Sequence, residues 1–145
     1  MPDLKNVLVV GVDGSENGQR ALEWALDEAV LRTASVVLMH GIDLGLAAAG
    51  PYGGGSMLDQ LQQSGQAVLA EAAALATARG VPSESRLETG SAAYSLIEAS
   101  KGASLLVVGS RGHGGFVGLL LGSVSATCVH HAHCPVVVVR PPDED

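Results

Sequence analysis

Aromatic side chains and cations are both scarce in this sequence of 145 residues. Phe, Trp and Tyr make up 3% of it, and 8 Lys plus Arg stand against 15 Asp plus Glu, which gives a formal net charge of −7. Nucleic-acid backbones are bound by clustered cations, and single-stranded bases stack on aromatic side chains. The composition therefore argues against a nucleic-acid-binding protein.

Cysteine is also rare, and no apolar run is long enough for a membrane span. Cys128 and Cys134 are too few for a disulfide framework, which favours a reducing compartment. The N-terminus lacks the basic patch and apolar stretch of a signal peptide. Residues 112–139 contain no Asp, Glu, Lys or Arg, but histidines, serines and a proline interrupt them before the ~18 apolar residues that a span needs. We expect a cytoplasmic protein without a membrane span.

Hydrophobic residues are abundant, at 47% of the sequence, with 16% charged. This is ample for one core in a chain whose length is typical of one domain. We expect residues 1–145 to form a single domain, with its core at about 4–140 and an acidic tail at 141–145.

Strand and helix patterns alternate along the chain. Apolar and β-branched runs predict buried strands, and a polar run predicts a strand at the sheet edge. The predicted strands are Val7–Val10, Ser35–Ile42, Ser83–Leu87 (the polar one), Leu105–Val108 and Pro135–Val139. Helical spacing predicts helices from a cap at Ser15 or Asn17 to about Arg32, and over 58–79, 91–101 and 123–131. The glycine-rich stretch 43–56 is predicted to be a mobile loop. The pattern is typical of an α/β fold, an open five-stranded parallel sheet with helices on both faces.

Two of the predicted strands end in glycine-rich segments, Gly11–Ser15 and Gly109–Gly122. In open α/β sheets, ligands bind beyond the carboxyl ends of the strands, where the strand order reverses. If these two strands are neighbours at the reversal, both segments face one crevice. The sequence then predicts one ligand site.

The second glycine segment has the chemistry of a phosphate site. Glycine at this density lets the backbone come close to a ligand, and the amides that open the helix at Ser123 suit an anion. The spacing is Gly109-x2-Gly112-x9-Gly122-Ser123, with no lysine. The alternative is a flexible loop with a helix cap. Walker A, dinucleotide-binding and nucleophile-elbow motifs are all missing.

Several stretches in the same order resemble the universal stress protein family. They are residues 9–15, His40 at the end of the second strand, and residues 107–114, 120–125 and 131–138. The glycine spacing is similar to that of the family's ATP-binding subclass. The resemblance implies a Rossmann-like fold related to the adenine nucleotide alpha hydrolases.

The resemblance also implies an ATP site, with AMP or a cyclic nucleotide as alternative ligands. Asp13 would lie beside the ribose or a phosphate-bound Mg²⁺, and the backbone at Gly41 would line the adenine. No metal site is implied from the protein alone, and no catalytic residue. The implied nucleotide-binding residues are Gly11, Val12, Asp13, Gly41, Gly109, Ser110, Arg111, Gly112, His113, Gly114, Gly115, Gly122, Ser123, Val124 and Ser125.

The family's last strand often pairs two subunits, which implies a homodimer through Val136, Val137, Val138 and Val139. The function implied is a nucleotide-dependent stress-response or signalling module that is not an enzyme. Two alternatives stay open, a dimeric adaptor that binds no nucleotide and a slow ATPase.

Two histidine-containing features are explained more simply by packing than by metal binding or catalysis. Cys128, Cys134 and the histidines between them suggest zinc, but a packed helix end is favoured. His40 is expected to be a hydrogen-bonded core histidine.

Overall fold

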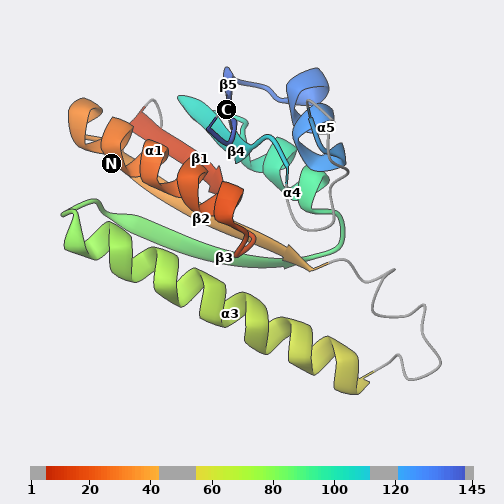
Figure 1. Ribbon diagram of the computed structural model, residues 1–145. Helices are drawn as coiled ribbons and strands as arrows, with labels where there is room; N and C mark the ends of the chain where they lie inside the picture. Colours follow the sequence, from red (N-terminus) through yellow and green to blue (C-terminus); the bar gives the residue numbers. More distant parts are fainter. Residues whose placement is uncertain (1–5, 43–54, 112–120, 143–145) are drawn as a thin grey trace.

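A parallel β-sheet organises the chain (Figure 1). The computed structural model describes residues 6–42, 55–111 and 121–142. In this part of the chain the sheet has five strands, in the order β3-β2-β1-β4-β5. The strands are β1 (Val7–Gly11), β2 (Ser35–Ile42), β3 (Ser83–Thr89), β4 (Leu105–Gly109) and β5 (Val136–Val139).

The strand order reverses between β1 and β4. The chain builds the sheet outward from β1 through β2 to β3, and then returns to add β4 and β5 on the other side of β1. Val10 lies opposite Val107 in this pairing. The carboxyl ends of β1 and β4 are therefore neighbours, which meets the condition under which the two glycine-rich segments predict one shared site.

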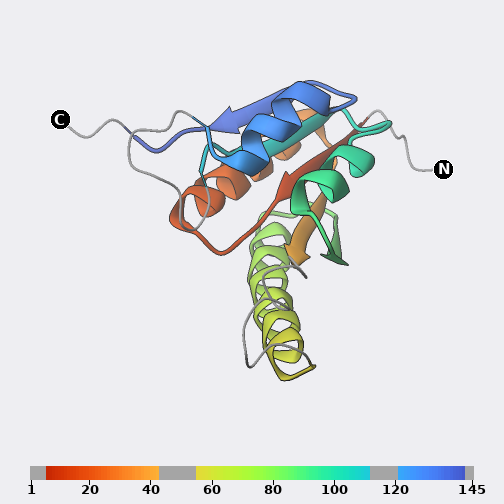
Figure 2. The same cartoon turned by 90° about the vertical axis from the view of Figure 1, so that its right-hand side faces the viewer.

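Helices cover both faces of the sheet, which confirms the predicted fold class. They are α1 (Glu16–Arg32), α3 (Gly55–Ala78), α4 (Ala92–Ala99) and α5 (Ser123–His131). Helices α1 and α3 share one hydrophobic core with the sheet, and α4 and α5 contribute to a second core on the opposite face. Figure 2 shows α4 and α5 together on their side of the sheet, with α1 behind it.

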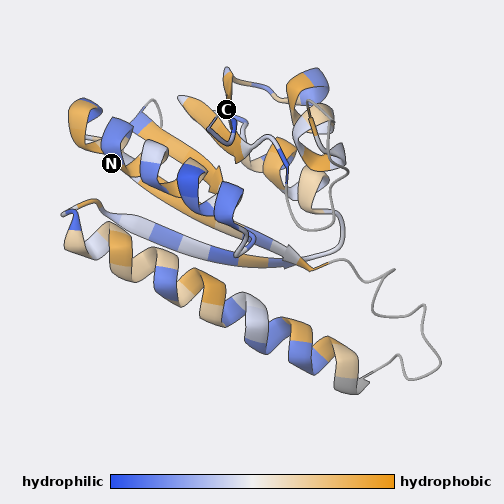
Figure 3. Ribbon diagram, in the orientation of Figure 1, coloured by the Kyte–Doolittle hydropathy of each residue, from blue (hydrophilic) through white to orange (hydrophobic). Residues whose placement is uncertain are grey.

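The central strands alternate between these two cores. In β1, Leu8 and Val10 face the core under α1 and α3, while Val9 faces the other. All three are 1% exposed or less, which is why this run has no polar residue. The edge strand β3 is largely hydrophilic in Figure 3, and its charges discourage pairing with another chain.

The predicted element boundaries hold to within about one residue, with three larger differences. Strand β3 continues to Thr89 because its pairing with β2 runs through Ile42. Helix α4 ends at Ala99, ahead of Gly102 with its φ of +81°. Helix α3 begins at Gly55, inside the predicted loop 43–56. Residues 43–54, and residues 143–145 of the predicted tail, lie outside the described residues.

Helix α1 starts and ends as its sequence indicates. Ser15 is the N-cap, and its hydroxyl accepts a hydrogen bond from Gly18 N at 3.0 Å. At the other end Thr33 adopts the left-handed conformation, with a φ of 54°. In the described ranges, no helix is long and apolar enough to cross a membrane.

Gly65 lets α3 pack closely on the sheet. A Cβ at this position would lie 2.7 Å from Leu87 Cδ1 and 2.8 Å from His40 Cδ2. Glycine inside a helix ordinarily costs ~1 kcal/mol relative to alanine, so the sequence keeps an unfavourable residue here for the sake of packing.

We predict that Gly65→Ala lowers the free energy of unfolding by about 1 kcal/mol, although alanine is the better helix former. The overpacking cost of ~1–3 kcal/mol exceeds the gain in propensity, because hydrogen bonding holds His40 in place. Denaturant unfolding measures this, with the exposed Gln66→Ala as a control that stays within ~0.5 kcal/mol of the unaltered chain. An alanine variant more stable than the unaltered chain would contradict the packing argument.

Candidate functional site

The segment after β1 is held by its backbone. Val12 N donates to Met39 O at 2.8 Å, and Val12 O lies 2.8 Å from His40 Nδ1. A carbonyl oxygen only accepts, so His40 Nδ1 must carry a proton. His40 is therefore hydrogen-bonded, as the sequence predicted, but it is half-buried and lies outside both hydrophobic cores. It fixes the chain immediately before Asp13.

Asp13 lies against the first turn of α1. Its Oδ1 accepts hydrogen bonds from Ser15 N at 2.9 Å and from Ser15 Oγ at 2.6 Å. A carboxylate at a helix N-terminus is stabilised by the helix dipole. A side chain at Gly18 would collide with the same Oδ1, so glycine is required there. The Asp13 carboxylate is thus held at the rim of the crevice and is partly exposed.

The segment after β4 begins in close contact with α1. A Cβ on Gly109 would lie 2.9 Å from Asn17 Nδ2 and 3.1 Å from Asn17 O. The same Nδ2 donates to Ser110 Oγ and to Arg111 O, both at 3.1 Å. The room that glycine leaves at position 109 is therefore taken by Asn17. This is a packing reason for the first glycine of the motif.

Ser110 joins four elements of the fold. It is 1% exposed, and its N–H donates to Val139 O of β5 at 2.8 Å. Its carbonyl accepts from Gly122 N at 2.6 Å and from Ser125 Oγ at 2.8 Å, while its hydroxyl accepts from Asn17. The two ends of the second glycine segment are thereby held together, next to the N-termini of α1 and α5.

The N-terminus of α5 has no side-chain cap. Gly122 is the N-cap, and it provides no side-chain hydrogen bond to the amides of this first turn. Ser123 and Val124 are exposed. Ser125 is buried, and its hydroxyl is used by Ser110 O and Gly122 O. These amides of the first turn lie at the positive end of the helix dipole, and the bond from Gly122 N to Ser110 O holds them near the end of β4.

Gly41 lies near this edge at the end of β2. The residue pair Gly11–Met39 is in register, so Asp13 and Gly41 each lie two residues further along neighbouring segments. A Cβ at Gly41 would come within 2.7 Å of the backbone and the Cβ of Ala92. Glycine is therefore needed here for α4 to pack against β2.

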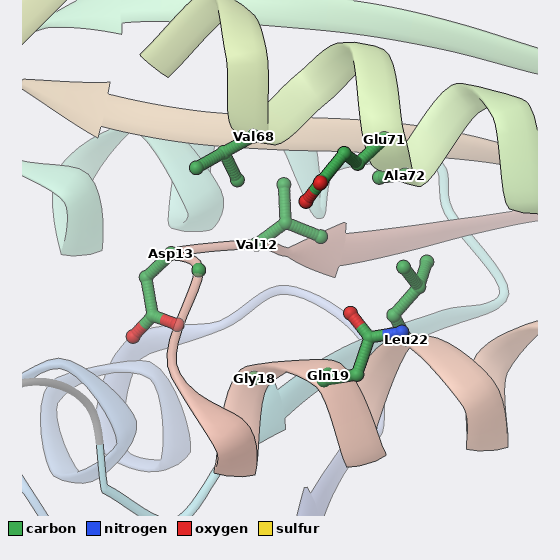
Figure 4. Close-up of a pocket in the computed structure, with 9 residues that line it drawn as sticks. Val12, Asp13, Gly18, Gln19, Leu22, Val68, Glu71 and Ala72 are labelled. Carbon is green, nitrogen blue, oxygen red and sulfur yellow. The ribbon is translucent and has the colours of Figure 1, made fainter. Parts of the chain in front are cut away.

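A pocket of about 50 Å³ opens between α1 and α3, behind the carboxyl end of β1. In Figure 4, Gln19 and Glu71 point into the space between the two helices, and the Asp13 carboxylate turns away from Glu71. By the same measure one water needs ~10–15 Å³, whereas sites for drug-sized ligands have ~300–1,000 Å³. The pocket has room for a few waters and is too small for a nucleoside.

The two cysteine thiols lie in surroundings that disfavour their ionised form. Cys128 is fully buried in the core, where burial raises the pKa of its thiol to about 11, and burial also raises the pKa of Cys134. Within the described ranges, no group of three His, Cys, Asp or Glu side chains is placed to hold a metal ion. Cys128 thus belongs to the second hydrophobic core, and Cys134 packs against it.

The structure thus brings most of the predicted site residues to one edge of the sheet. Residues 11–13, 109–111 and 122–125 gather around the ends of β1 and β4. Gly112, His113, Gly114 and Gly115 lie outside the described residues. The hydroxyls of Ser110 and Ser125 are both engaged in hydrogen bonds within the protein. The sequence predicts Asn17 only as an alternative cap, and nothing in the local pattern signals its contact with residues 110 and 111.

Known proteins with a similar sequence and fold agree on the family. A universal stress protein of Mycolicibacterium smegmatis is 40% identical over 143 residues, covering 96% of this chain and 47% of that protein. The chain spans about half the length of the curated relatives it matches.

Two solved structures with a similar fold contain a bound nucleotide. A universal stress protein in complex with cAMP has a TM-score of 0.72 and 29% identity, covering 95% of this chain and 98% of that one. An AMP-bound universal stress protein family protein of Arabidopsis thaliana has a TM-score of 0.67 and 26% identity, covering 94% and 92%. The model of the universal stress protein family matches residues 5–140, and the chain belongs to that family.

Proposed function

We propose that this chain binds an adenine nucleotide, ATP in preference to AMP or a cyclic nucleotide, and acts as a nucleotide-dependent stress-response or signalling module. The observation that carries the proposal is the closure at Ser110, which holds both ends of the glycine segment beside the uncapped N-terminus of α5. The relatives solved with cAMP and AMP support the ligand class.

The phosphates would be held mainly by backbone amides. The first turn of α5 supplies N–H groups and the positive end of a helix dipole, and neither needs a lysine. Arg111 follows Ser110 directly and is half-buried, so one cation lies just beyond the end of β4. A chain with a net charge of −7 would need such local donors to attract a polyanion.

Asp13 fits a role beside Mg²⁺ only together with a nucleotide. Mg²⁺ in phosphate sites is commonly held by one or two carboxylates plus the phosphates themselves. Among the described residues Asp13 is not part of any group able to hold a metal ion alone. The ion would therefore arrive with ATP, where it would separate the phosphate charge from the carboxylate.

The first experiment is to denature freshly purified protein and identify any released nucleotide by chromatography. We expect an adenine nucleotide, or, from an empty preparation, binding of added Mg-ATP in calorimetry. ADP that accumulates during incubation with ATP would identify the slow ATPase. A chain that releases nothing and binds neither Mg-ATP nor AMP would contradict the proposal and would leave the adaptor of the same fold.

Asp13→Asn tests the carboxylate without removing its structural role. Asparagine keeps an oxygen that accepts from Ser15, so the first turn of α1 stays intact. We predict a loss of Mg-ATP affinity of at least tenfold, about 1.4 kcal/mol, and a smaller loss for metal-free AMP. Calorimetry measures both ligands. Asp59→Asn, the same charge change at an exposed position on α3, should leave both affinities unaltered.

Equal losses of affinity for Mg-ATP and AMP would indicate that Asp13 contacts the ribose and not the metal ion. Unchanged affinity for both ligands would remove it from the site.

We also propose that two copies of the chain pair through β5. Strand β5 is an edge of the sheet in the described part of the chain, and its four valines are half-buried. Val139 O accepts from Ser110 N, and backbone groups along a strand alternate in direction. Val136 and Val138 therefore direct their N–H and C=O groups to the outer edge. An unpaired apolar edge is an aggregation hazard that pairing with a second copy would remove.

Val138→Pro tests this pairing at the backbone. Proline deletes an N–H that β4 does not use, keeps much of the apolar side chain, and is tolerated at a sheet edge. We predict a folded monomer by sedimentation velocity and circular dichroism, against a dimer for the unaltered chain. Val138→Ala retains the N–H and should remain a dimer. A proline variant that stays dimeric would place the interface elsewhere.

A further inference from the structure

Asn17 connects the first turn of α1 to the start of the second glycine segment, across 93 positions of sequence. Its Nδ2 donates to Ser110 Oγ and to Arg111 O, and both distances are 3.1 Å. Its backbone carbonyl carbon and oxygen also lie against Gly109. This one residue thus contacts three successive residues at the end of β4.

The orientation of the Asn17 amide follows from its partners. Arg111 O only accepts, so the group facing it must be the NH₂ and not the amide oxygen. Asn17 Oδ1 is consequently turned into the protein, where it is buried and has no hydrogen-bond partner within the described ranges. A buried acceptor without a partner is unfavourable. The two hydrogen bonds that Nδ2 donates offset this unfavourable contribution.

The two donor bonds fix backbone that the proposed site needs. In a trans peptide the N–H lies opposite to the C=O, so holding a carbonyl in a loop also determines where amide donors point. Arg111 O is held in this way, and Ser110 is held on its side chain by Asn17 and on its carbonyl by Gly122 and Ser125. Donors that are already ordered bind a ligand more tightly, because binding then carries no entropic cost for ordering them.

We propose that Asn17 is a positioning residue of the nucleotide site. It sets the affinity for nucleotide by holding Ser110 and Arg111 against α1, without itself touching the ligand. The inference rests on the proposed function, since it concerns the same site.

Asn6, which precedes β1, offers a control at the opposite end of α1. Its Nδ2 donates to two backbone carbonyls there, Arg32 O and Thr33 O, each at 3.4 Å. Asn6→Ala therefore removes asparagine hydrogen bonds at the C-terminal end of the helix, as Asn17→Ala removes them at the N-terminal end. Only the second contact lies at the proposed site.

The experiment compares Asn17→Ala, Asn17→Asp and Asn6→Ala with the unaltered chain. Calorimetry measures affinity for Mg-ATP and AMP, thermal unfolding measures stability without nucleotide, and amide hydrogen exchange by NMR follows Gly122 N–H. We expect both Asn17 variants to lose affinity at least tenfold for both ligands and to exchange the Gly122 amide at least tenfold faster. Asn6→Ala should stay within twofold on both measures, whatever its effect on unfolding.

Aspartate is the second variant because it suits the first turn of a helix. A negative charge there is favourable for α1, so the helix is preserved while an acceptor replaces the donor that faced Arg111 O. Unaltered affinity in both Asn17 variants would overturn the inference and leave the proposed function standing. An equal loss in Asn6→Ala would also overturn it, by showing that affinity follows general stability. An unaltered chain that binds no adenine nucleotide would overturn the proposed function, and the inference with it.

Discussion

The carbonyl of Ser110 carries the constraint on which the rest of the site depends. It accepts from Gly122 N at 2.6 Å and from Ser125 Oγ at 2.8 Å, so two points separated by the whole second glycine segment meet at one oxygen. This closure holds the N-terminus of α5 beside the end of β4. Burial to 1% exposure keeps water from competing for these bonds. A site made of backbone donors requires such a fixed frame, because the backbone has no rotamers with which to adapt.

The glycines at this edge have packing reasons that a motif alone does not reveal. Gly109 leaves room for Asn17, Gly41 for Ala92 and Gly18 for the Asp13 carboxylate. In each case the atoms that fill the space belong to the protein itself. Loss of binding in a bulky Gly109 variant would therefore not by itself prove contact with a ligand, because the junction of α1 and β4 would move as well. Substitutions that keep the shape of the side chain, such as Asp13→Asn and Asn17→Asp, distinguish the loss of a functional group from a change in packing.

Local physics made most of the fold predictable. The β-branched runs predicted β1, β2 and β4 because a strand buried on both faces excludes polar residues, and Ser15 was among the predicted caps because only short polar side chains satisfy the first turn of a helix. The meeting of the glycine segments at β1 and β4 was conditional on a strand order that the sequence does not contain, and the structure confirms that order. Asn17 was missed because its contacts span 93 positions, and an asparagine in a first helical turn has the same local pattern whether it caps the helix or reaches another strand. Hydrophobic periodicity indicates which face of a helix or strand is buried. It does not indicate which distant backbone atoms lie opposite that face.

The two proposals share one residue, and this has a structural consequence. The N–H of Ser110 bonds to Val139 at the end of β5, and its carbonyl and hydroxyl hold the frame of the proposed nucleotide site. A ligand that tightened this frame would also restrain the end of β5, and a second copy paired along β5 would restrain Ser110 in return. Coupling between two binding events is reciprocal in free energy, so whichever event comes first lowers the ordering cost of the other. A buried serine with all its polar groups occupied is suited to transmit such a restraint, because it cannot move at one bond without disturbing the others.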